Sequence, residues 1–202
     1  MSDPVPAPVR EATASALLLS RSHGQWLVGL ILHPRYRVWM ASGGHVEGSE
    51  APADAVRREV REETGLHVQL VPGPALPAPA GWPHPSEPAP WWTASVAVVP
   101  DSHTAEPHIH IDHMFLALVD DRHEVLGEQG EADHPLGWFG AARLQTTPAV
   151  GPDFRALALD VLRRLGNSTA SDPEVLAAHL VGTTEPVPAS AGDGAVAGSC
   201  ER

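Results

Sequence analysis

GGHVEGSEAPADAVRREVREETGL, residues 43–66, is the stretch of this sequence that decides the fold. A glycine pair precedes a segment whose polar and apolar residues have the spacing of an amphipathic helix. Pro52 suits the first turn of such a helix, and Gly65 suits its C-terminal cap. The stretch therefore predicts a loop at Gly43-Gly44 and a helix over residues 50–64.

Three carboxylates share one face of the predicted helix. At about 100° per residue, Glu59, Glu62 and Glu63 fall within an arc of ~100°. Like charges so close repel one another, so a compensating cation is expected, and oxygen ligands suit Mg²⁺ or Mn²⁺. Arg58 can meet Glu62 at i,i+4 and Asp54 on its other side, which would fix their rotamers.

The alternative is that this helix simply presents a solvated face laced with salt bridges. The glycine pair favours the metal site, because Gly43-Gly44 permits backbone conformations and close approaches that are closed to other residues.

Outward from the helix, the chain reads as alternating strands and helices, which indicates the α/β class. Strands are expected at 14–19, 26–32, 66–71, 93–99 and 109–119, and helices at 152–165 and 172–180. A Pro-rich loop spans 72–90. We expect a flexible N-terminal leader (1–11), one domain (12–166), a short C-terminal helical extension (167–182) and a disordered tail (183–202).

The motif residues resemble the full Nudix box: Gly44, Glu50, Arg58-Glu59-Val60, Glu62-Glu63 and Gly65-Leu66 stand at its spacing. The resemblance implies an α/β/α sandwich with a mixed β-sheet. It also implies metal-dependent hydrolysis of a nucleoside diphosphate linked to another moiety, with Mg²⁺, or Mn²⁺ in its place.

Roles for single residues are implied by the same resemblance. Glu59 and Glu63 would be the principal metal ligands and Glu62 an additional one. Gly43 would offer its backbone carbonyl, Glu50 would help from outside the coordination sphere, and Arg58 would orient the glutamates. Many members have proline before the glycine pair, whereas this chain has Ser42, which loses the proline's restraint on the loop.

Composition limits the partners of the protein. The 202 residues carry 13 Lys+Arg against 25 Asp+Glu, a net charge of −12, which argues against broad contact with a nucleic-acid duplex. Apolar runs are too short to span a bilayer, and Met1–Arg10 lacks the features of a secretory signal, so we expect a cytoplasmic protein. The expected partner is a small nucleotide-type substrate, and the resemblance makes a homodimer a further expectation.

A second group of candidates lies on the 109–119 strand and beside the Pro-rich loop. His108, His110 and Asp112 fall on one face of the strand by its period of two, and imidazoles favour zinc or another transition metal. The alternative is a strand entrance that lines the substrate cleft or hydrogen-bonds locally, with His110 and Asp112 as substrate-side residues. Trp92 could stack on a nucleobase or, alternatively, cover part of the core.

The general base is expected outside the box, because the box glutamates are occupied by metal. The loop over 127–134 carries glutamates and glycines, and the resemblance implies a base shortly before a tryptophan like Trp138. Glu131 is the first candidate and Glu128 the second, and a solvated acidic loop is the alternative. A nucleotide-binding or regulatory module without turnover is the alternative function, although the intact set of box glutamates favours an enzyme.

Overall fold

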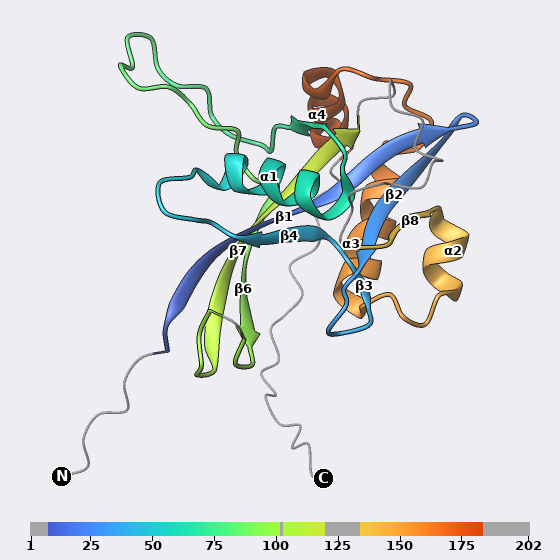
Figure 1. Cartoon of the computed structure of the whole chain (residues 1–202). Coiled ribbons are helices and arrows are strands. Elements are labelled where there is room, and N and C mark those ends of the chain that lie inside the picture. The colour runs from blue at the N-terminus through green and yellow to red at the C-terminus, as the bar shows by residue number, and fades with distance from the viewer. Residues whose placement is uncertain (1–7, 102, 120–133, 184–202) are drawn as a thin grey trace, which may run out of the picture.

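The computed structural model describes residues 8–101, 103–119 and 134–183 (Figure 1). The predicted base candidates Glu128 and Glu131, and the predicted tail after residue 183, lie outside the described residues. The elements run in the order β1 (Arg10–Ser22), β2 (Gln25–Leu32), β3 (Trp39–Met40), β4 (Ser42–His45), α1 (Pro52–Thr64), β5 (Val68–Val71), β6 (Trp92–Val98), β7 (His108–Val119), β8 (Leu136–Phe139), α2 (Ala141–Thr146), α3 (Pro152–Leu165) and α4 (Pro173–Gly182).

Two long strands form the centre of an eight-stranded mixed sheet. β1 and β7 run parallel, paired from Arg10↔Ile109 to Leu19↔Leu118. β1 also pairs antiparallel with β2 at its C-terminal half and with β4 at its N-terminal half. β7 pairs antiparallel with β5 and β6, while β3 and β8 extend the sheet from β2. Each central strand therefore contacts different partners along its length.

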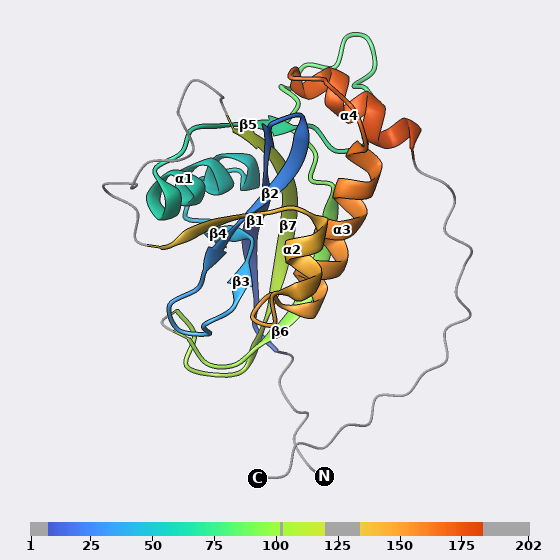
Figure 2. The ribbon, with the colours of Figure 1, turned by 90° about the vertical axis from the view of Figure 1, so that its right-hand side faces the viewer.

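Helices cover both faces of this sheet (Figure 2), which confirms the predicted α/β/α sandwich. Along β1, Ala14, Ala16 and Leu18 belong to the core under α1. The alternate residues Leu17 and Leu19 belong to the core under α3 and α4, as the period of two in a strand requires. The apolar end of β7 is buried on both faces, as its sequence predicted.

The box helix α1 begins at Pro52, two residues later than predicted. Pro52 disfavours a helical conformation in the residue before it, so Ala51 is extended, with φ −80° and ψ 152°. Glu50 therefore sits in the preceding turn, where its N–H donates to the carbonyl of Glu47 at 2.8 Å. The other end is as predicted, because Gly65 adopts a left-handed conformation (φ 71°) that ends the helix.

The C-terminal helices pack on the sheet face opposite α1. α3 has the predicted bounds, and α4 follows it with Leu176 and Leu180 fully buried in the same core. Asp172 caps α4 by accepting hydrogen bonds from two backbone N–H groups at 3.0 Å. None of the helices in the described ranges is long and apolar enough to cross a bilayer.

Candidate active site

Gly43 and Gly44, which the sequence predicted as a loop, lie in strand β4, and this strand meets the end of α1 at a buried carboxylate. Ser42 Oγ donates to Glu63 Oε2 at 2.6 Å, and the Gly43 N–H donates to the same oxygen at 3.0 Å. Ser42 is fully buried, and the Glu63 side chain is 11% exposed. The serine that stands in place of the expected proline is thus a hydrogen-bond donor to a predicted metal ligand.

Burial dominates the electrostatics of Glu63 and raises its pKa to about 7. The hydrogen bonds from Ser42 and Gly43 oppose this effect, whereas the nearby charges of Glu59 and Glu62 add to it. A cation at this position would favour the ionised form of Glu63.

Both glycines of β4 lie where an added Cβ would come too close to neighbouring atoms. A Cβ at position 44 would lie 2.4 Å from Glu59 Oε1, and a Cβ at position 43 would lie 2.3 Å from the carbonyl oxygen of Ala14 on β1. Only glycine lets the Glu59 carboxylate rest against β4 while β4 stays paired with β1. The backbone of β4 and the carboxylates of α1 therefore face one another.

Arg58 connects the turn before α1 to two of the glutamates. Its guanidinium donates to both carboxylate oxygens of Glu50, at 2.8 and 3.1 Å. It also donates to Glu59 Oε1 at 2.8 Å and to Glu62 Oε2 at 3.2 Å. The Glu50 hydrogen bond is the largest of the interactions that raise the pKa of Arg58. The same bond holds the pKa of Glu50 below its usual value. The hydrogen bonds of the Arg58 guanidinium therefore hold in place carboxylates that would otherwise repel one another.

The predicted contact between Arg58 and Glu62 is present, but the predicted contact with Asp54 is wrong. Asp54 instead pairs with Arg57 at 3.2 Å. Arg58 turns away because Glu50, which lies in the turn rather than in the helix, offers a bidentate partner. The helical period alone did not reveal this partner.

One residue at this site was not predicted from the sequence. The backbone N–H of His134 donates to the backbone carbonyl of Glu63 at 3.3 Å, and its Nδ1 lies 3.8 Å from Glu63 Oε1. That buried Nδ1 has no hydrogen-bond partner among the described residues. His134 is one of 12 histidines in the chain and no motif marks it, so only the fold reveals its position.

The predicted substrate-side residues lie elsewhere on the sheet. Asp112 accepts hydrogen bonds from Thr13 Oγ1 at 3.1 Å and Ser15 Oγ at 2.7 Å. Trp92 packs against the core under α3, which fits its core-covering alternative. His110 contacts His108 and Glu11, so the predicted trio of His108, His110 and Asp112 is divided between two sets of partners.

The structure therefore places Glu63 and Glu59 against the backbone of Gly43 and Gly44, and Arg58 joins Glu59 to Glu62 and Glu50. Their carboxylate and carbonyl oxygens are the donor set that Mg²⁺ or Mn²⁺ prefers, and the carboxylates would repel one another without a cation. These residues fit a hard divalent ion.

Comparison with known proteins identifies the family and the fold. Residues 5–159 match the NUDIX domain family. Among solved structures, a NUDIX-family hydrolase from Clostridium perfringens is 25% identical, with a TM-score of 0.59, over 78% of this chain and 99% of that one. The NUDIX domain of Shewanella oneidensis NrtR, solved with ADP ribose, shares the fold at 17% identity and a TM-score of 0.50, over 81% of this chain and 94% of that one. No curated protein matches the sequence significantly. The family match over most of the chain and the shared fold show that this protein belongs to the NUDIX family of hydrolases.

Proposed function

We propose that this protein is a metal-dependent hydrolase that cleaves the pyrophosphate bond of a nucleoside diphosphate linked to another moiety. The observation that carries the proposal is that Glu63 and Glu59 lie against the Gly43-Gly44 backbone, while Arg58 ties Glu62 to Glu59. A solvated helix face would not need a carboxylate as buried as Glu63.

Glu59 and Glu63 would hold the ion, with Glu62 and the Gly43 carbonyl as further ligands. When bound, a divalent ion would neutralise pyrophosphate oxygens and lower the pKa of a water molecule. Arg58 keeps Glu59 and Glu62 oriented, and Ser42 keeps Glu63 Oε2 in place. Because the protein carries a net charge of −12, its anionic substrate would be drawn in through the metal rather than through surface arginines.

We further propose that the general base is Glu131, with Glu128 as the second candidate. The contacts of His134 with Glu63 support this choice, because His134, the last residue of the loop over 127–134, lies against the end of α1. Glu131→Gln should lower kcat by roughly 10² to 10⁴ with metal affinity nearly unchanged. An unchanged kcat would exclude Glu131 and make Glu128→Gln the next variant, whereas lost metal binding would make Glu131 a ligand.

The deciding experiment is a screen for product mass with nucleoside triphosphates, ADP-ribose, NADH and nucleotide sugars, in Mg²⁺ and in Mn²⁺. ADP-ribose merits the first assay, because the NrtR domain with the same fold was solved with it. Glu63→Gln is the matched inactive control. Turnover by the wild-type protein alone would support the hydrolase. Calorimetric binding of a nucleotide without any product would favour the alternative, a module that senses a nucleotide.

A further inference from the structure

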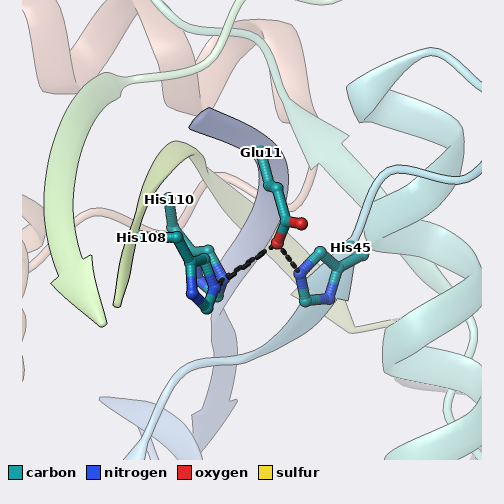
Figure 3. A group of neighbouring side chains, drawn as sticks. All are labelled: Glu11, His45, His108 and His110. Carbon is teal, nitrogen blue, oxygen red and sulfur yellow. Dashed lines mark hydrogen bonds and ion pairs between the residues drawn. The ribbon is translucent and has the colours of Figure 1, made fainter. Parts of the chain in front are cut away.

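Four metal-binding side chains from three strands meet at the end of the sheet (Figure 3). Glu11 comes from β1, His45 ends β4, and His108 and His110 come from β7. One donor atom from each lies within 4.8 Å of all the others. Strand register explains the meeting, because Glu11 is paired with His110 and Thr13 is paired with His45.

The distances between donor atoms of this histidine cluster (Glu11, His45, His108 and His110) bracket those between the ligands of a tetrahedral metal ion. Glu11 Oε2 lies 3.0 Å from His45 Nε2, 3.4 Å from His108 Nε2 and 3.8 Å from His110 Nε2. The two Nε2 atoms of His108 and His110 are 3.0 Å apart. A tetrahedral Zn²⁺ with bonds of about 2.0–2.2 Å separates its ligands by roughly 3.3–3.6 Å, which falls within this range.

The donor atoms are also correctly oriented. His108 Nδ1 lies 2.9 Å from the carbonyl oxygen of Glu106, which can only accept, so this nitrogen carries the proton. The Nε2 of the neutral ring then directs its lone pair at the cluster. Thr104 Oγ1 donates to Glu11 Oε1 and leaves Oε2 to face the histidines. Outer hydrogen bonds of this kind orient metal ligands in proteins.

The imidazole rings of His108 and His110 face each other within the cluster. His108 has a fully buried side chain, and its Nε2 faces the Nε2 of His110. At 3.0 Å, either a shared proton or a bound cation must lie between the two nitrogens, so a cation can take the place of this hydrogen bond.

Asp101 brings a further negative charge to the cluster. Its Oδ2 lies 3.4 Å from His108 Nε2 and 3.7 Å from His110 Nε2, while its Oδ1 accepts two N–H groups of the following turn. A divalent cation at the cluster would be stabilised by this charge as well as by Glu11.

The cluster lies on the other side of the sheet from the box glutamates. Ala14 and Ala16 point to the core under α1, so Glu11, in the alternate register of β1, lies on the opposite face. One link joins the two sites: the backbone carbonyl of His45 accepts a hydrogen bond from Arg58 at 3.0 Å. The two sites therefore have separate ligands.

We propose that Glu11, His45, His108 and His110 bind one divalent transition-metal ion of the zinc class, separate from the hard ion of the box. Three imidazoles and one carboxylate are a donor set that favours Zn²⁺ over Mg²⁺. A four-ligand site is typical of a structural ion, and this ion would join the first residues of β1 and β7 to the last residue of β4.

The test measures metal binding alone, without substrate. The purified full chain is stripped with chelator, titrated with zinc sulfate in excess Mg²⁺ by calorimetry, and loaded with Co²⁺ to record the visible absorption of a tetrahedral site. We expect one equivalent of zinc and the tetrahedral cobalt spectrum. His110→Ala and Glu11→Gln should each weaken zinc binding more than about tenfold.

Two controls separate this site from others. His84→Ala changes a histidine of the Pro-rich loop and should bind zinc like the wild type. Glu59→Gln changes the box and should also keep its zinc, whether or not the protein hydrolyses any nucleotide. Absence of stoichiometric zinc, its loss in Glu59→Gln, or its retention in both cluster variants with native circular dichroism would overturn the proposal.

Discussion

Glu63→Gln should make the metal-free protein more stable while removing its activity. The carboxylate is buried, and burial raises its pKa from 4.5 to about 7, so ionised Glu63 opposes folding. Glutamine has nearly the same shape, carries no charge and still offers an oxygen to Ser42 and Gly43. The variant therefore removes the cost of a buried charge at the expense of a metal ligand.

The difference in stability between Glu63→Gln and the wild type depends on pH. Its sign follows because the pKa of Glu63 is raised in the folded state. A raised pKa in the folded state means that the stability contributed by protonated Glu63 is complete below about pH 4.5 and is lost as the pH rises through about 7. The variant should exceed the wild type by about 1 kcal/mol at pH 5 and about 3 kcal/mol at pH 8. For a domain of this size, the larger difference raises Tm by roughly 6–12 °C.

The assay is thermal and urea unfolding in chelator at several pH values. Glu62→Gln is the matched control, because its side chain is 58% exposed and its removal should change stability by less than about 0.5 kcal/mol. Mg²⁺ should then raise the Tm of the wild type but not that of Glu63→Gln. A difference between variant and wild type that is independent of pH, or a variant that is less stable at pH 8, would refute the reasoning.

Three further variants test how the box is held. Ser42→Ala removes the 2.6 Å donor to Glu63, so the pKa of that carboxyl should rise further; Mg²⁺ affinity at pH 7 should fall roughly tenfold or more, and the acidic limb of the pH–activity profile should move to higher pH. Arg58→Lys loses the bidentate contact with Glu50 and should lower kcat with little change in Tm, measured by steady-state kinetics and thermal melts. Gly44→Ala places a Cβ against the Glu59 carboxylate and should weaken Mg²⁺ binding in calorimetry, whereas Gly182→Ala, in open space, should bind Mg²⁺ as the wild type does.

The sequence predicted the features that depend on local periodicity and spacing. The α/β class, the Gly65 cap, the α3 helix and the doubly buried end of β7 follow from patterns within a few consecutive residues, and the structure confirms them. The α/β/α sandwich, which the family resemblance implied, is confirmed as well. The NUDIX family membership is also confirmed, because the box fixes many positions within one short stretch.

What could not be predicted depends on register between distant strands. The sequence grouped His108, His110 and Asp112 by the period of one strand, but β1 supplies different partners along its length. Glu11 and His45 meet the two histidines, while Thr13 and Ser15 bind Asp112. Local patterns do not contain a pairing between residues 99 positions apart.

Ser42 shows a different limit of sequence reasoning. Its position before the glycine pair suggested only a missing restraint on the loop. In the fold, the hydroxyl provides a hydrogen bond to the most buried glutamate of the box, which proline could not provide. A departure from a family pattern can thus be a chemical replacement, which becomes visible only when the partner is placed beside it.

The parallel pairing of β1 with β7 has a consequence for how the chain acquires its structure during synthesis. The partners of β1 residues 10–19 are residues 109–118, so the central ladder cannot close until more than half of the chain has left the ribosome. Until then, β1 can form its hairpin with β2, but the edge that pairs with β7 stays unpaired. The apolar residues of α1 also lack the part of their core that β7 supplies. Contacts of such long sequence separation slow folding, and unpaired edges invite aggregation. Expression at lower temperature should therefore favour soluble protein. Aggregation of incomplete chains is then slower, so each chain can pair its own β1 with β7 before it associates with another chain.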